Sequence, residues 1–149
     1  MSDAELRDER AIRALVARYC HAIGACDDAA WAATWAEDGE WRVLGNTVRG
    51  RAAVLEHYQK LVAGVSFVVQ MAFDGIIEVS GDRAEGRWQI LEVLQFLGGR
   101  SAQNIGHYQD QYVRGTDGEW RFALRDFSPR YLGAPDLSSP PAAPRKSAS

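Results

Sequence analysis

The sequence predicts an α+β fold in which three N-terminal helices pack on one face of a strongly curved, mostly antiparallel sheet. Apolar residues recur at helical spacing early in the chain, whereas from Ser66 onward β-branched and aromatic runs alternate with turn residues. Helices followed by strands is an order typical of α+β domains. A chain of 149 residues, 46% of them hydrophobic, can bury the core of one domain.

Three segments carry helical patterns. Residues 3–25 place apolar side chains three and four positions apart, which predicts one long amphipathic helix. A short alanine-rich helix with an aspartate as its N-cap is expected at 28–35, and the segment RAAVLEHYQKLV predicts a third helix at 51–62. His21 and His57 lie off the apolar stripes of their helices, so both are expected on the surface.

One hairpin is expected before the third helix and five strands after it. The hairpin joins EWRVL to TVR through Gly45-Asn46. The last three strands of the chain should form an antiparallel meander. The five later strands are placed at 66–73, 75–80, 83–97, 101–114 and 119–128. The proline-rich end has too little apolar content to order itself, so we expect a domain over 1–134 and a flexible tail over 135–149.

Charge and cysteine patterns exclude several classes of protein. The net charge is -3 and the basic residues are scattered, so nucleic acid is not an expected partner. The chain shows no signal-peptide pattern and no apolar run of about 18 residues, which predicts a cytoplasmic protein with no membrane partner. Cys20 and Cys26 would lie about 9 Å apart along a helix, too far for a disulfide, so both are predicted to be free thiols. Together with His21 they lack the further ligands of a zinc site, so no metal is expected.

Glu92 interrupts an apolar row in the longest predicted strand. The apolar members of this row are Trp88, Ile90, Leu94 and Phe96. Such a carboxyl can be paired with an arginine such as Arg125 or Arg87, exposed at a sheet edge, or desolvated and able to act as a general acid or base. In the next strand His107 and Tyr108 point to opposite faces, so only one of them can line a pocket.

Four segments, in order, resemble the SnoaL-like family of the nuclear transport factor 2-like superfamily. They are AIRALVARYCHAI, AAWAATWAEDGEW, VRGRAAVLEHY and GHYQDQYVRGTDGEWRFALRDF, and the resemblance covers residues 8–130. This superfamily includes ketosteroid isomerase, scytalone dehydratase, hexachlorocyclohexane dehydrochlorinase and polyketide cyclases. The resemblance implies a cone-shaped α+β barrel with an apolar cavity, a homodimer or homotrimer, and no metal or organic cofactor.

The sequence departs from this family at two positions. In the dehydratase and dehydrochlorinase branch, an aspartate at the end of the first helix and a histidine before the second sheet segment form a proton-abstracting pair. The corresponding positions here hold Gly24 and Gln70. Neither residue can take up a proton near neutral pH, so any acid or base chemistry must come from other groups.

The resemblance also implies a set of pocket residues. It places the pocket walls at Tyr19, Trp41, Ile90, Glu92, Tyr108, Arg125 and Phe127, and Gln70 and His107 are added as candidate substrate contacts. We expect Glu92 to act as the base while Tyr19 or Tyr108 donates a hydrogen bond to the developing oxyanion. Arg125 would orient a carbonyl or anionic group, or hold Glu92 ionised. The aromatic residues can equally be ordinary core packing.

Three functions follow as hypotheses. The first is a cofactor-independent lyase or isomerase acting on a small hydrophobic molecule, cyclic or polyketide-like. The second is a non-catalytic shell that binds hydrophobic ligands, and the third is an assembly module that associates through its sheet. The first is favoured because a glutamate on an apolar strand face is costly to keep without a use or a partner.

Overall fold

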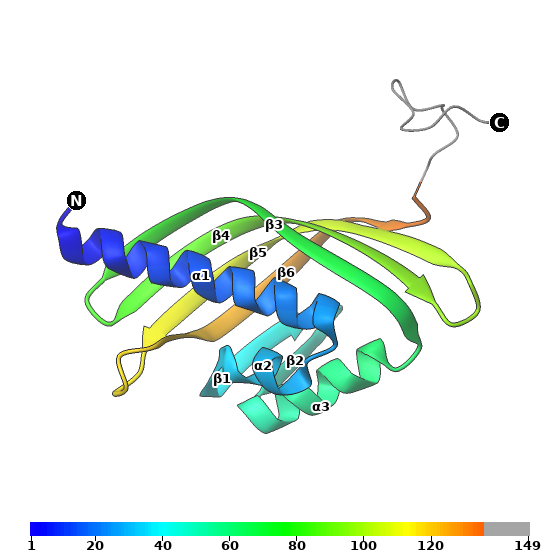
Figure 1. Cartoon of the computed structure of the whole chain (residues 1–149), viewed down its shortest axis with the longest axis horizontal. Coiled ribbons are helices and arrows are strands. Elements are labelled where there is room, and N and C mark those ends of the chain that lie inside the picture. The colour runs from blue at the N-terminus through cyan, green and yellow to red at the C-terminus, as the bar shows by residue number, and fades with distance from the viewer. Residues whose placement is uncertain (136–149) are drawn as a thin grey trace, which may run out of the picture.

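A computed structural model describes residues 1–135 and shows three helices packed on one curved six-stranded sheet (Figure 1). The elements are α1 (Asp3–Ala25), α2 (Asp28–Ala33), β1 (Trp35–Val43), β2 (Asn46–Arg49), α3 (Arg51–Val62), β3 (Val65–Ser80), β4 (Arg83–Phe96), β5 (Ser101–Arg114) and β6 (Trp120–Gly133). The predicted α+β class with a curved, mostly antiparallel sheet is confirmed, and the sheet curls without closing. The predicted tail at 135–149 lies outside the described residues, except for its first residue.

The sheet has the strand order β2-β1-β6-β5-β4-β3. Strands β3 to β6 form a continuous antiparallel series, which confirms the predicted meander. Strand β1 instead runs parallel to β6, a pairing between segments far apart in the chain that local patterns did not predict. This pairing brings the β1–β2 hairpin to one end of the curved sheet, below α1 in Figure 1.

Helix α2 is shorter than predicted, because the last residues of the expected helix belong to the sheet. The helix ends at Ala33, and Trp35 begins β1 as the partner of Phe122 in β6. The side chain of Trp35 is fully buried, so tertiary pairing prevails over the helix propensity of the alanines. The N-cap is the expected aspartate, since Asp27 Oδ1 accepts a hydrogen bond of 2.9 Å from the backbone N–H of Ala30.

The strands predicted at 66–73 and 75–80 form one bent strand, β3. A bulge separates the pairings of Phe73 and Ile76, and within it Asp74 has a positive φ of 50°. A Cβ atom added to Gly75 would lie 2.3 Å from the Trp88 ring, so this position accepts only glycine without rearrangement. The predicted break is therefore a bulge that bends the strand.

The hairpin turn is shifted by one residue from its predicted place. Val43 pairs with Asn46, so the two central residues are Leu44 and Gly45 rather than Gly45 and Asn46. Their φ angles are 49° and 80°. Positive φ at both central residues is typical of the type I′ turn that closes two-residue hairpins.

Helix α1 lies along the concave face of the sheet and buries one stripe of side chains against β3 and β6 (Figure 1). His21 is exposed on its outer face, as predicted. The prediction for His57 was wrong: its ring is half-buried and packs edge-on against Trp41, with centroids 5.8 Å apart. Cys20 and Cys26 are free thiols, as expected. Within residues 1–135 no helix has the length and apolar character needed to cross a membrane.

Candidate functional site

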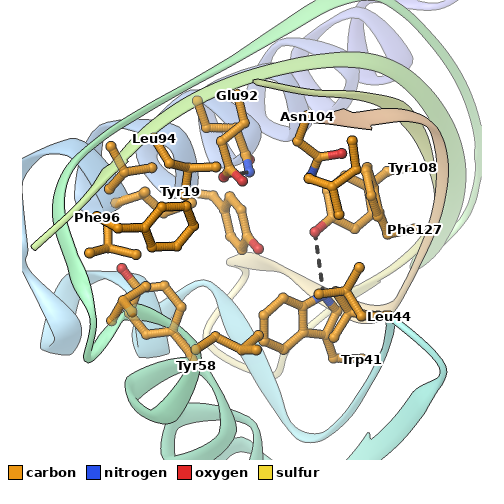
Figure 2. A pocket seen from close by; sticks show the side chains of 18 residues that line it. Tyr19, Trp41, Leu44, Tyr58, Glu92, Leu94, Phe96, Asn104, Tyr108 and Phe127 are labelled. Carbon is orange, nitrogen blue, oxygen red and sulfur yellow. Dashed lines mark hydrogen bonds between the residues drawn. The ribbon is translucent and has the colours of Figure 1, made fainter. Parts of the chain in front are cut away.

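A cavity of about 290 Å³ lies between the concave face of β3–β6, the end of α1, helix α3 and the β1–β2 hairpin (Figure 2). Most of its lining is apolar, with a small number of polar groups, a composition typical of small-molecule sites. Six of the nine residues proposed from the sequence line it. They are Tyr19, Trp41, Gln70, Glu92, Tyr108 and Phe127.

Glu92 faces this cavity from the middle of β4. It is the direct cross-strand partner of Gln70 on β3 and of Asn104 on β5, so three polar side chains form one row across the sheet. Gln70 Nε2 donates a hydrogen bond of 2.7 Å to Glu92 Oε2, and the Asn104 side chain lies beside the carboxyl on the other flank. Burial raises the pKa of Glu92, and the two neighbouring amides oppose the rise only in part.

Neither alternative interpretation of Glu92 holds in the structure. Arg87 points to the exposed outer face of β4, and Arg125 pairs with Asp110 instead. Among the ion pairs of the described residues, none includes Glu92. Strand β4 lies between β3 and β5, so the carboxyl is not at a sheet edge either. Glu92 is therefore a desolvated carboxyl flanked by two amides.

Arg125 lies behind the cavity rather than in its wall, which differs from the predicted substrate contact. Its guanidinium is fully buried and forms two hydrogen bonds with Asp110, of 2.8 and 3.0 Å. The rings of Tyr19, Tyr108 and Phe122 surround it at 4.4, 3.8 and 4.2 Å from their centroids. Burial alone lowers the pKa of an arginine, but attraction to the Asp110 carboxylate outweighs it and raises the pKa of Arg125.

Two phenol groups form the floor of the cavity. Trp41 Nε1 donates a hydrogen bond of 3.3 Å to the Tyr108 hydroxyl, which leaves the O–H of Tyr108 free to donate (Figure 2). Tyr19 lies within hydrogen-bonding reach of Tyr108. Burial raises the pKa of both phenols, so both are neutral donors near pH 7. Neutral donors aimed at a carbonyl oxygen can stabilise an oxyanion.

The other predicted positions are distributed differently. Phe127 lines the cavity and packs on Tyr108, with centroids 5.1 Å apart. Ile90 is buried beneath the cavity, and His107 points to the opposite face of β5 from Tyr108, so neither lines the cavity. Gly24 is exposed near the end of α1, where a Cβ atom would meet the backbone oxygen of Val68 at 3.8 Å.

Several residues that line the cavity were not predicted from the sequence, among them Asn104, Tyr58 and Leu44. Asn104 could have been found, because it lies four residues before Tyr108 on the same face of β5. Tyr58 could also have been found from the apolar stripe of α3, and it stacks on Trp31 with centroids 4.1 Å apart. Leu44 carried no signal, because the turn was placed one residue later.

Comparison with known proteins agrees with this architecture. The family model of the SnoaL-like domain matches residues 4–126. No curated protein sequence matches the chain. A solved structure of a protein of unknown function from Mycobacterium tuberculosis is 33% identical, with a TM-score of 0.77 over 85% of this chain and 74% of that one.

Two further solved structures are similar over nearly the whole chain. LinA is 25% identical, with a TM-score of 0.83 over 97% of this chain and 99% of its own. Hexachlorocyclohexane dehydrochlorinase LinA-type3 from Novosphingobium barchaimii LL02 is 23% identical, with a TM-score of 0.82 over 91% and 96%, a likeness of fold alone. Because the family model matches most of the sequence, this chain belongs to the SnoaL-like domain family.

Proposed function

We propose that this protein is a lyase or isomerase that removes a proton next to the carbonyl group of a hydrophobic small molecule, using its own side chains. One observation supports this above all. Glu92, a desolvated carboxyl, faces the same apolar cavity as the neutral phenols of Tyr19 and Tyr108. A base and an oxyanion donor on one cavity are the two groups that enolisation requires.

In this mechanism the Glu92 carboxylate takes a proton from the carbon beside the carbonyl. The electron pair of the broken C–H bond forms the C=C bond of an enolate, and the carbonyl oxygen becomes an oxyanion that accepts a hydrogen bond from Tyr108, whose own oxygen lies within reach of the Tyr19 O–H. If the substrate has a C=C bond between its β- and γ-carbons, the product of deprotonation is a dienolate, which takes the proton back from Glu92 at the γ-carbon, an isomerisation. If the substrate instead has a leaving group on its β-carbon, the enolate expels that group with the electron pair of its bond and a C=C bond forms, an elimination.

Gln70 supports this chemistry although it occupies the position of the family histidine. Its amide cannot act as a base, but its N–H donates to Glu92 and favours the ionised form. Burial raises the pKa of Glu92, and the neighbouring amides of Gln70 and Asn104 lower it, so the net rise is smaller than burial alone would cause. A carboxyl with a pKa moved toward the working pH is a better general base than an ordinary surface carboxylate.

A second candidate function is a non-catalytic shell that binds hydrophobic ligands. The observation that favours it is the loss of both proton-handling positions of the family, since Gly24 is exposed and Gln70 is a neutral amide. A shell of this kind would bind apolar ketones saturably and leave their protons in place.

Hydrogen–deuterium exchange separates the two functions without knowledge of the natural substrate. Simple apolar ketones such as acetophenone are incubated with the protein in D₂O, and loss of the proton signal beside the carbonyl is followed by NMR. We expect wild-type protein to accelerate exchange, Glu92→Gln to lose about 10²–10⁴-fold, and Tyr108→Phe about 10²–10³-fold. Glu85→Gln, on the exposed face of the same strand, is the matched control and should keep the wild-type rate. Saturable binding without exchange would establish the binding shell instead.

A further inference from the structure

Three leucines around the mouth of the cavity are unusually exposed for residues that line a pocket. Leu44 comes from the β1–β2 turn, Leu61 from α3 and Leu132 from the end of β6. Their exposed fractions are 49%, 39% and 58%. We call these three residues the leucine rim.

The two phenols of the cavity and the leucine rim differ sharply in burial. Tyr19 and Tyr108 at the floor are 1% and 3% exposed, and Glu92 is partly buried. The polar groups of the lining are therefore buried or partly buried, whereas its exposed residues are all leucines. A ligand that presents its carbonyl to the phenols would place its remaining part against the leucine rim.

Leu44 gives independent support for a role of the rim. It has a φ of 49°, in the left-handed region that a bulky side chain adopts at a cost. A type I′ turn favours asparagine or glycine at this position. The nearest asparagine, Asn46, lies two residues later, so the turn position itself holds a leucine. A strained leucine kept beside a cavity points to a use for its side chain there. Figure 2 shows Leu44 at the cavity wall next to Trp41 and Tyr108.

We propose that the leucine rim binds an extended apolar tail of the substrate, so that the substrate class is a carbonyl compound with an aliphatic chain rather than a compact ring enclosed by the cavity. That the substrate has a carbonyl group rests on the proposed function. That it has an aliphatic tail rests on the leucine rim alone. The three leucines line the same cavity as Glu92 and the two phenols, and their exposed side chains offer apolar surface at its solvent side.

Binding of a homologous series tests the proposal. Dissociation constants of alkyl phenyl ketones from acetophenone to octanophenone are measured by calorimetry. For wild-type protein we expect affinity to rise by up to about fourfold for each added methylene. In Leu61→Ser and Leu132→Ser this increment shrinks, so the loss of affinity grows with chain length. Leu6→Ser, an equally exposed leucine on α1 outside the cavity lining, should keep the wild-type increment.

Leu44→Asn provides a variant whose result cannot be attributed to misfolding. Because asparagine tolerates the left-handed region, we expect the melting temperature to rise by about 2–4 °C while the increment per methylene falls. A lower melting temperature, or an increment equal to that of wild type, would overturn the role of Leu44.

The outcomes also separate this inference from the proposed function. Ketone exchange in D₂O with no dependence of affinity on chain length would overturn the leucine rim and leave the base chemistry intact. A clear chain-length increment without exchange would support the rim and contradict the proposed catalysis. A flat wild-type series together with a change of association state in Leu61→Ser, seen by sedimentation, would show that a second copy covers the rim and would overturn the proposal.

Discussion

Gln70 and Glu92 are direct partners across β3 and β4, and the Gln70 amide donates a 2.7 Å hydrogen bond to the carboxyl. At the opposite end of the same amide, Gln70 Oε1 accepts a hydrogen bond of 3.8 Å from the Cys20 thiol. This second contact fixes which end of the amide faces Glu92. Cys20 of α1 thus helps to orient the Gln70 amide, and this amide in turn favours the ionised form of Glu92 on β4.

Replacement of Gln70 by leucine should raise the pKa of Glu92 further. The donor that favours the ionised carboxylate is lost, while the burial that disfavours it remains. Because a hydrogen bond to a charged group contributes about 1.5–3 kcal/mol, we expect a rise of roughly one to two pH units. Titration of the carboxyl carbon by NMR measures this rise. Gln89→Leu, on the exposed face of β4, should leave the titration in place, and an equal rise in both variants would contradict the account.

The stability of the protein should depend on pH through Glu92 in a definite direction. Because the pKa of Glu92 is raised in the folded state, the folded protein keeps this proton over a window in which the unfolded chain has lost it. Stability therefore falls as the pH rises through this window, from the ordinary glutamate pKa to the folded one. We expect Glu92→Gln to melt higher than wild type at pH 7 and to lose most of this advantage at pH 4. If the melting temperatures of Glu92→Gln and wild type differed by the same amount at pH 4 and pH 7, the raised pKa of Glu92 would be contradicted.

Removal of the charge of Asp110 should destabilise the fold strongly. Asp110→Asn leaves the fully buried guanidinium of Arg125 without its anionic partner, a change that costs about 3–5 kcal/mol. Urea unfolding measures the loss. The matched control is Asp126→Asn, because Asp126 pairs with Arg42 at the surface at 3.5 Å, and this change should cost at most about 1 kcal/mol. Similar losses in the two variants would contradict the assigned role of burial.

The bulge of β3 should tolerate only glycine at its centre. Gly75→Ala would drive its Cβ atom into the ring of Trp88, and we expect a loss of about 1–3 kcal/mol in unfolding free energy. At Gly98 an added Cβ atom meets open space, so Gly98→Ala should be nearly neutral. Denaturant unfolding of the two variants gives the comparison, and equal stability would show that the strand can shift without cost.

The sequence predicted those features that depend on neighbours along the chain. The apolar spacing of residues 3–25 predicted the long helix, and the alternation along β4 correctly placed Glu92 on the same face as Trp88 and Ile90. Features that depend on distant partners were missed. Trp35 left its predicted helix because of its partner Phe122, and Arg125 is held by Asp110 rather than by Glu92. Alternation shows which face a side chain takes, but it does not show which of several charged neighbours on that face becomes its partner.

The pH dependence of ketone exchange in D₂O, measured for wild type and Glu92→Gln, tests the central claim most directly. If Glu92 is the base, the wild-type rate rises with pH through one midpoint that lies above the ordinary glutamate pKa, and the variant loses both the rise and about 10²–10⁴-fold of the rate. An unchanged profile in Glu92→Gln would contradict the claim, since the exchange would then proceed without the carboxyl.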